Sequence, residues 1–278
     1  MNTRSGSIRT KSRRKGRAAG KKSLRDKLLP TGTFCLILMI WWALSATGAI
    51  PAFMLPSPAD VVSAFVRDFP NLMNHAFVSL QEALWGLLIG TLLAFGLACA
   101  MDRFLHLEKA VLPLLVVTQT IPAIAIAPLL VLWMGFGKEP KITLVVITTF
   151  FPIAVGLLDG FKSTDPDAIA LLRSMNATRG QIFRHVKIPA ALPYFFSGLK
   201  ISASYAVIGA VISEWLGGFE GLGVYMTRVR KAYAFDKMFA VILLVVVVSL
   251  LLMKLVTVIR KLAMPWLKYR PETSGQKT

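Results

Sequence analysis

Residues 238–259 read MFAVILLVVVVSLLLMKLVTVI, an apolar run whose only charged side chain is Lys254. A helix needs about 20 mostly apolar residues to cross the hydrocarbon core of a bilayer. This run is long enough to cross, and it lacks the apolar-polar alternation of a membrane barrel strand. The stretch therefore predicts a transmembrane helix, and it indicates the class of the whole chain.

Other stretches of the same character recur along the sequence, at residues 33–50, 83–101, 110–134, 142–158 and 194–212. Their backbone hydrogen bonds must be satisfied without water, so each is expected to be helical. The sequence predicts an all-α membrane protein with six transmembrane helices. An even number of spans places both termini on the same side of the membrane.

The overall composition agrees with this class. The 278 residues are 55% hydrophobic and 17% charged, with a mean hydropathy of +0.62. Soluble domains have about 45–50% apolar and about 25% charged residues. Disordered chains are poor in large apolar residues. An ordinary soluble enzyme and a disordered chain are therefore both excluded.

The positive charge is distributed unevenly. The chain has 32 Lys and Arg against 14 Asp and Glu, and 11 of the basic residues precede position 28. Such a tail is typical of a nucleic-acid-binding arm or of a cytoplasmic segment before a first span, and a cleaved signal peptide is a third interpretation. With the N-terminus inside, 24 basic residues fall on the cytoplasmic side and seven outside, while Lys254 snorkels at the inner end of its span.

This asymmetry predicts that both termini lie in the cytoplasm. We expect residues 1–30 to form a basic cytoplasmic tail without a nucleic-acid partner. Residues 31–262 would form the six-span domain, and residues 263–278 a second cytoplasmic tail.

The longest inner connection, residues 161–192, has a helical pattern. Apolar residues recur in it at steps of three and four, with a break at residues 176–180. The segment is either a docking site for another protein or a pair of helices lying on the membrane surface. The pattern alone leaves both open.

The sequence carries no recognisable motif of catalysis or metal binding. The stretch GFGKE at 135–139 lacks the upstream glycine and the hydroxyl residue of a phosphate-binding loop. The histidines, at 75, 106 and 185, are far apart, and Cys35 and Cys99 fall in separate apolar runs. We therefore expect no catalytic residue, no metal site and no cofactor held by this chain, and we do not expect an enzyme.

The inner loop carries a specific pattern. Residues 170–177 read ALLRSMNA, and VKIP follows at 186–189. This arrangement resembles the EAA loop of binding-protein-dependent ABC importer permeases, with Ala170 in place of the usual Glu and Asn176 in place of the usual Gly. Asn tolerates the left-handed backbone conformation, so the turn is expected to survive. The resemblance implies an ATPase-coupling loop that includes Ala170, Leu171, Leu172, Asn176, Ala177, Thr178, Arg179, Gly180, Gln181, Val186, Ile188 and Pro189.

Further motifs extend the resemblance over nearly the whole chain after the tail. They include QTIP at 119–122, APL at 127–129, WMGFG at 133–137 and SEWLGG at 213–218. They are similar to the branch that imports nitrate, aliphatic sulfonates, taurine and thiamine-pyrimidine precursors. Residues 214–215, 223–226 and 264–266 are most similar to the pyrimidine-precursor and riboflavin types.

The resemblance implies a type I importer permease in the bacterial inner membrane, paired as a homodimer. Cytoplasmic ABC ATPase subunits would bind ATP and Mg, and an extracytoplasmic solute-binding protein would deliver the substrate. A heterocycle such as a thiamine-pyrimidine precursor is the first expectation, and sulfonate, taurine or nitrate the alternative. A secondary carrier that needs no ATPase is a further alternative, but it does not explain the inner loop.

The translocation path is expected to involve Gln119, Pro122, Pro128, Glu214 and Trp215. Proline breaks can line a cavity in transporters, although a simple packing kink is the other interpretation. Gln119 would line the path or bond a neighbouring helix. Glu214 would line the path, hold the glycine-rich segment after it, or reach the interface. Glu82 and Asp159 are expected to be boundary residues of their spans.

Overall fold

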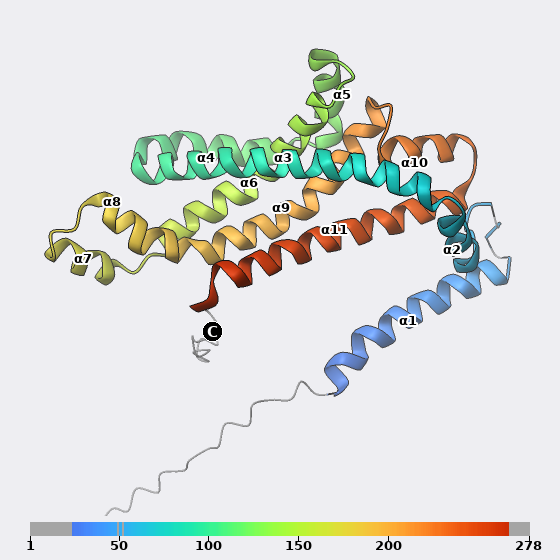
Figure 1. The fold of residues 1–278 in the computed structure, drawn as a ribbon, viewed down its shortest axis with the longest axis horizontal. Helices are drawn as coiled ribbons and strands as arrows, with labels where there is room; N and C mark the ends of the chain where they lie inside the picture. Colours follow the sequence, from blue (N-terminus) through green and yellow to red (C-terminus); the bar gives the residue numbers. More distant parts are fainter. Residues whose placement is uncertain (1–23, 49, 52, 267–278) are drawn as a thin grey trace, which may run out of the picture. The chain divides into compact units, whose positions relative to one another are not determined.

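The structure is a computed structural model that describes residues 24–48, 50–51 and 53–266. It contains two compact units, residues 1–50 and residues 51–278. The first unit holds helix α1 (Leu24–Ala46) (Figure 1). From residue 29 onward, the apolar side chains of this helix are mostly exposed. The basic tail at residues 1–23 and the end of the chain from residue 267 lie outside the described residues.

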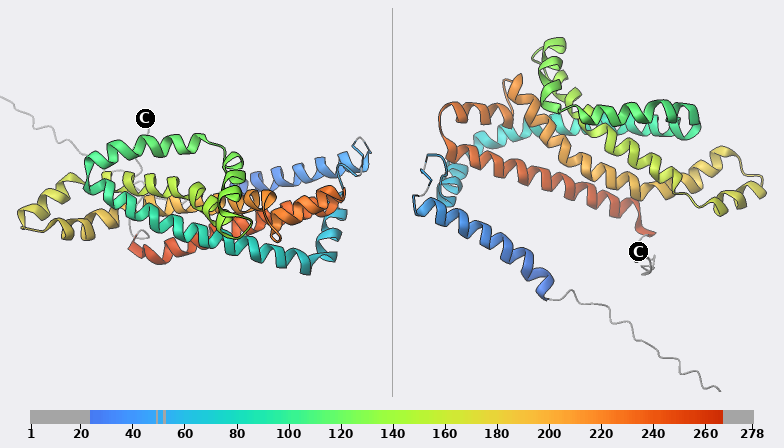
Figure 2. Two further views of the ribbon diagram at one scale, coloured as in Figure 1. Left: turned by 90° about the horizontal axis from the view of Figure 1, so that it is seen from above. Right: turned by 180° about the vertical axis from the view of Figure 1, so that it is seen from behind.

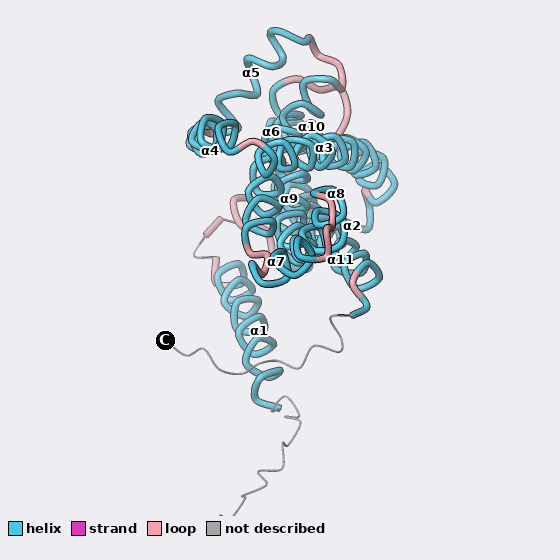
Figure 3. Tube along the Cα trace, turned by 90° about the vertical axis from the view of Figure 1, so that its left-hand side faces the viewer, coloured by secondary structure: helices cyan, strands magenta, loops and turns pink. Residues whose placement is uncertain are grey.

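The second unit is built from helices joined by short loops, and its described residues include no strand (Figure 3). In chain order the helices are α2 (Pro58–Arg67), α3 (Phe69–Arg103), α4 (Leu105–Thr120), α5 (Ala123–Met134), α6 (Glu139–Lys162), α7 (Pro166–Ser174), α8 (Arg179–Ile182), the π-helix η1 (Phe183–Lys187), α9 (Ile188–Leu216), α10 (Leu222–Lys231) and α11 (Phe235–Ala263).

Helix boundaries follow local chemistry. Ser57 caps α2 by accepting a hydrogen bond from the amide of Asp60 at 3.2 Å, and the Asp60 carboxylate accepts one from the Ser57 amide at the same distance. Pro58 stands at the first helical position, where its missing N–H has no cost. Asp165 and Pro166 start α7 in a similar way. These side chains satisfy amides that the first helical turn leaves unpaired.

The predicted spans correspond to helices of the structure. Five helices in the described part of the chain are long and apolar enough to cross a membrane: α1, α3, α6, the continuous helix from Arg179 to Leu216, and α11. The remaining predicted span, residues 110–134 and third in chain order, is not one helix. The chain bends by 98° between α4 and α5, at Ile121 and Pro122, so this span is a pair of helices joined at a break. Pro122 cannot continue the α4 hydrogen-bond ladder, whereas Pro128 lies inside α5 without ending it.

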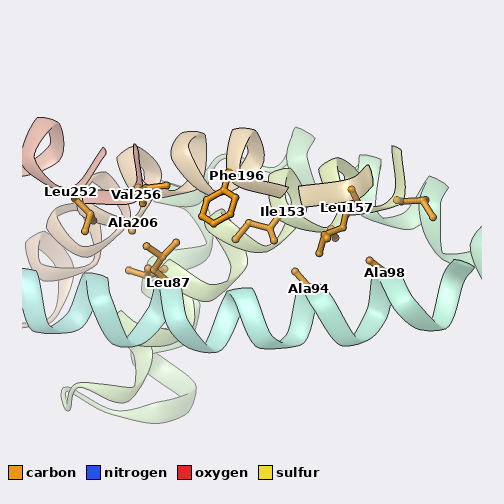
Figure 4. Packing of buried hydrophobic residues seen from close by; sticks show 14 of the residues in the cluster. Leu87, Ala94, Ala98, Ile153, Leu157, Phe196, Ala206, Leu252 and Val256 are labelled. Carbon is orange, nitrogen blue, oxygen red and sulfur yellow. The ribbon is translucent and has the colours of Figure 1, made fainter. Parts of the chain in front are cut away.

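The long helices α3, α6, α9 and α11 run side by side (Figures 1 and 2). Their facing side chains form the main core, in which Ala94 and Ala98 of α3 meet Ile153 and Leu157 of α6 (Figure 4). Small residues at these contacts let the backbones approach closely. Close packing is the main attraction between helices in lipid, because lipid tails are as apolar as the side chains.

The contact between α6 and α9 depends on Gly198. A methyl group at this position would collide with the backbone carbonyl of Pro152. Nearby, the Ser202 hydroxyl donates to the Thr149 carbonyl at 2.8 Å, which adds a hydrogen bond between the same two helices. The two helices therefore pack backbone against backbone and form the rigid centre of the unit.

Two structured segments lie at opposite ends of these long helices. Helices α7 and α8 lie beyond one end, and α10 packs at the other, against α3, α9 and α11 (Figure 1). Following the charge-based prediction, we call the α7–α8 end inner and the α10 end outer.

Candidate functional site

The inner loop turns at Asn176. Its φ of 59° lies in the left-handed region that favours Gly or Asn. The Asn176 amide donates to the Arg173 carbonyl at 3.0 Å, and the Ala177 amide donates to the Leu172 carbonyl at 2.9 Å. This pair of bonds is a Schellman motif, which closes the C-terminus of α7. The expectation that Asn176 preserves the turn is confirmed.

A capping box starts the next helix. The Thr178 hydroxyl accepts from the Gln181 amide at 3.3 Å, and the Gln181 side chain accepts from the Thr178 amide at 2.7 Å. From Arg179 the helix continues through η1 and α9 to Leu216. The predicted coupling residues therefore begin a helix that extends to the outer end of the unit.

Packing braces this segment against the long helices. Ile182 is buried, and the Phe183 ring lies 5.2 Å from the ring of Phe161 on α6. Lys187 donates to both carboxylate oxygens of Asp102, at 2.6 and 2.8 Å. These contacts connect the start of the long helix to α3 and α6.

The tip of the loop is exposed and partly apolar. Leu171 is 63% exposed and Met175 is 69% exposed. Ala170, where the motif has Glu, is also exposed, whereas Leu172, Val186, Ile188 and Pro189 are half-buried. Exposed apolar residues beside a capped turn form a surface that a partner protein can cover.

The break between α4 and α5 opens a cavity of about 250 Å³. Two predicted path residues, Gln119 and Pro122, line it, and Thr148 of α6 and Tyr205 of α9 face the same space. The other lining residues are Thr118, Ile121, Ala123, Ile126, Ile147, Ile208, Gly209 and Ile212.

The remaining predicted path residues lie elsewhere. Pro128 is an exposed residue within α5. Trp215 is half-exposed and lines a different cavity, of about 510 Å³, beside Phe136 and Phe219. The described structure thus does not gather the five predicted path residues in one place.

Glu214 holds the start of α10. Its Oε2 accepts the Gly223 amide at 2.6 Å, and its Oε1 accepts the Ser79 hydroxyl at 2.6 Å. The Leu222 amide donates to the Ser79 Oγ at 2.8 Å, and the Gly221 amide donates to His75 Nδ1 at 3.0 Å. Three successive amides that the helix cannot pair itself are therefore satisfied by side chains of α3 and α9. Of the roles considered for Glu214, holding the glycine-rich segment is the one that these contacts support.

A buried ion pair completes this group, which we call the outer cluster: His75, Ser79, Glu82, Lys141 and Glu214. Lys141 Nζ lies 3.0 Å from Glu82 Oε1, and the two side chains are 5% and 1% exposed. Glu82, which we expected to be a boundary residue of its span, is instead buried among the helices. A charge can be buried at this depth because it is paired.

The sequence pattern did not predict the roles of several residues of these sites, among them His75, Ser79, Lys141 and Tyr205. The first two had a usable signal, because His75, Ser79 and Glu82 recur at steps of four and three on one helix face. Lys141 carried no local signal, since its partner is 59 positions away.

Outside the cluster, Tyr225 of α10 donates a hydrogen bond to the carboxylate of Asp68, just before α3. Burial, and then the Asp68 carboxylate, raise the pKa of the Tyr225 hydroxyl. The hydroxyl therefore remains a donor and ties α10 to the start of α3.

The chain is similar to a family of transport proteins. Residues 86–268 match the family model described as "Binding-protein-dependent transport system inner membrane component". A "Probable ABC transporter permease protein" of Haemophilus influenzae is 38% identical over 217 residues, covering 78% of this chain and 89% of the relative. The formylaminopyrimidine transport permease protein ThiX of Halalkalibacterium halodurans is 36% identical, covering 84% of this chain and 94% of the relative.

Relatives with other named substrates are also found. They include the riboflavin transport permease RibX of Chloroflexus aurantiacus, at 31% identity, and the taurine transport permease TauC of Escherichia coli, at 26%. These names fall in the branch that the sequence motifs resemble.

The fold has a solved counterpart in the MetNI methionine ABC transporter. One of its chains superposes with a TM-score of 0.61 at 20% identity, covering 68% of this chain and 94% of that chain. The family match, the membrane helices and this fold lead to one conclusion. The chain belongs to the inner-membrane permeases of binding-protein-dependent ABC transport systems, as a non-catalytic, membrane-spanning subunit.

Proposed function

We propose that this permease works as a homodimer and moves a small, uncharged heterocycle, with a thiamine-pyrimidine precursor as the first candidate. The substrate would reach it from an extracytoplasmic binding protein. ATP and Mg would be bound by the partner ATPase subunits. The proposal depends on one observation, the chemistry of the cavity at the break between α4 and α5.

No residue that lines this cavity is charged. Moving an anion such as taurine's sulfonate or nitrate into an uncharged site costs free energy unless a cation accompanies it. An uncharged heterocycle has no such penalty. The lining therefore favours the heterocycle over the sulfonate, taurine and nitrate alternatives.

The polar groups of the cavity suit a planar ring with hydrogen-bonding edges. The hydroxyl groups of Thr118 and Thr148 donate to their own helix carbonyls, at 2.7 and 3.0 Å, so only their acceptor capacity is left. The Gln119 amide makes no side-chain hydrogen bond with another described residue, so it can both donate and accept. Tyr205 adds an aromatic face on which a ring can stack.

The names of two relatives also favour a heterocyclic substrate. ThiX is named for formylaminopyrimidine and RibX for riboflavin, and both are more similar to this chain than the taurine permease TauC. A formylaminopyrimidine and a riboflavin molecule each contain a nitrogen heterocycle.

Uptake by cells that express the complete transport system tests the substrate class. A labelled aminopyrimidine should accumulate, unlabelled taurine should not compete, and Gln119→Leu should lower uptake while ATPase association stays normal. Competition by taurine as strong as by the unlabelled pyrimidine would contradict the proposal.

We propose further that the inner loop is the ATPase-coupling element, with α8 as its coupling helix. Ala177 is half-buried between the Schellman turn and α8. Ala177→Asp should abolish uptake and weaken ATPase association, and Ala263→Asp, an exposed alanine at the inner end of α11 and outside the loop, is the matched control. Unchanged uptake by Ala177→Asp would reject this assignment.

The division into a tail at residues 1–30, a six-span domain at 31–262 and a tail at 263–278 also remains a proposal. Because the family match begins at residue 86, the N-terminal tail is not needed to define the family. Uptake after deletion of residues 2–22 tests whether the tail has a role in transport. Normal uptake would argue against an essential arm.

A further inference from the structure

A third, larger cavity lies at the inner end, between α3 and the coupling loop. It has a volume of about 810 Å³, and residues of α3, α7, α8 and η1 line it. No path residue lies in it. The cavity is therefore separate from the proposed translocation path.

Positive charge dominates its lining. Arg103 of α3, Arg173 of α7, Arg179 of α8 and Lys187 of η1 face it, and Asp102 is its only acid. Both carboxylate oxygens of Asp102 already accept hydrogen bonds from Lys187, so this acid has little capacity to neutralise the arginines.

The three arginines make no ion pair with another described residue. They are exposed, come from three different helices and line one hollow. Guanidinium groups arranged in this way bind phosphate oxygens through charge-assisted hydrogen bonds.

The rest of the wall is apolar. Ile169, Ile182 and Phe183 line the same cavity, next to the thiol of Cys99. A site with arginines on one side and apolar side chains on the other suits a molecule that carries a phosphate on an apolar body. Arg103 is in the last turn of α3, so the cavity lies where the inner end of that span meets the cytoplasmic side.

We propose that this cavity binds the phosphate group of an amphiphilic phosphate ester. Its source would be either an anionic phospholipid of the inner leaflet or a free phosphate ester of the cytoplasm. Basic pockets at the cytoplasmic ends of transmembrane helices hold lipid headgroups in this way. The bound group would tie α7 and α8 to the end of α3, and it would thereby hold the coupling loop in place.

An acidic side chain of the ATPase is the competing occupant. The exposed apolar residues of the loop, Leu171 and Met175, do not line the cavity. A partner that covers this tip alone does not enter the hollow, whereas one that docks on α8 meets its rim at Arg179 and Gly180. The apolar wall also suits a phosphate amphiphile better than a lone carboxylate.

Cys99 supplies a reporter inside the cavity. In the full chain carrying Cys35→Ser, Cys99 is the one remaining cysteine. The rate of its modification by a neutral maleimide is measured in a neutral maltoside detergent. The probes are dioctanoyl phosphatidylglycerol, dioctanoyl phosphatidylcholine and inorganic pyrophosphate.

Phosphatidylglycerol or pyrophosphate should slow the modification severalfold, whereas zwitterionic phosphatidylcholine should not. Protection by phosphatidylglycerol alone identifies the lipid as the source, and protection by pyrophosphate identifies a free phosphate ester. Failure of both probes to protect, or equal protection by phosphatidylcholine, would overturn the proposal. So would protection by the purified ATPase subunit when neither probe protects.

Matched variants test the arginines. Arg173→Gln and Arg179→Gln should each weaken the protecting ligand about fivefold, the effect of about 1 kcal/mol per basic residue near an anionic surface. Arg184→Gln removes the same charge from an exposed η1 residue that does not line the cavity, so protection should be unchanged. Equal weakening by Arg184→Gln would mean that general charge attraction, and not this cavity, holds the ligand.

Discussion

Glu214 of α9 accepts a hydrogen bond from the backbone amide of Gly223 at 2.6 Å, so a carboxylate near the end of one helix caps the first turn of the next. Ser79 donates to the other oxygen of the same carboxylate. The outer helix α10 is therefore held by the transmembrane helices, and not only by its own connecting loops.

Removing this cap should destabilise the permease. Glu214→Ala leaves a buried amide and a buried hydroxyl without their acceptor, and each unsatisfied group costs about 1–3 kcal/mol. Thermal unfolding of the purified protein in detergent measures the effect. Glu220→Ala removes an exposed acid from the same segment and should change the midpoint little. Equal shifts in the two variants would argue against the capping role.

The buried ion pair of Glu82 and Lys141 should behave as a unit. Lys141→Met leaves the carboxylate buried without its cation, which typically costs about 3–5 kcal/mol. The double variant Glu82→Gln with Lys141→Met removes both charges and should be less destabilised than Lys141→Met alone. A double-mutant cycle on unfolding midpoints measures the coupling between the two side chains. Additive effects would show that the pair contributes nothing beyond its separate members.

Two glycine positions on long helices should respond in opposite ways to the same substitution. Gly198→Ala places a methyl group against the Pro152 carbonyl and should separate α6 from α9, with lower stability and less protein in the membrane fraction. Gly96→Ala meets no atom within 4 Å and should be neutral, or stabilising by up to about 1 kcal/mol through helix propensity. The amount of each variant in the membrane fraction and its thermal unfolding midpoint measure these effects. Tolerance of Gly198→Ala would be inconsistent with the close contact.

The turn at Asn176 should accept glycine but reject a β-branched residue. Asn176→Gly keeps the left-handed conformation available, and uptake should stay near the wild-type rate. Asn176→Val disfavours that conformation by about 1–2 kcal/mol and should lower both uptake and ATPase association. Co-purification of the ATPase with each variant, next to uptake, separates a coupling defect from loss of folded permease. Normal coupling in Asn176→Val would mean that the turn geometry is not required.

Local patterns predicted much of this molecule. The apolar runs located the membrane helices, and the EAA-like spacing located the turn at Asn176, because hydropathy and backbone preference are properties of short segments. The Glu82–Lys141 pair could not be predicted, since it depends on how α3 packs against α6. The proline in QTIP indicated a break, but the 98° bend depends on the surroundings of α4 and α5. Tyr205 could not be predicted, because the sequence of α9 does not indicate which of its faces lies next to the break between α4 and α5.

The continuous helix from Arg179 to Leu216 has Thr178 capping its first turn and Glu214 in its last turn. Its 38 residues span about 57 Å at about 1.5 Å per residue, which exceeds the thickness of the hydrocarbon core. One continuous helix therefore connects the inner loop with the segment that holds α10. Thermodynamic linkage makes such coupling reciprocal. If docking of a binding protein at α10 changes the affinity of the inner loop for the ATPase, the ATPase changes the affinity for the binding protein by the same factor.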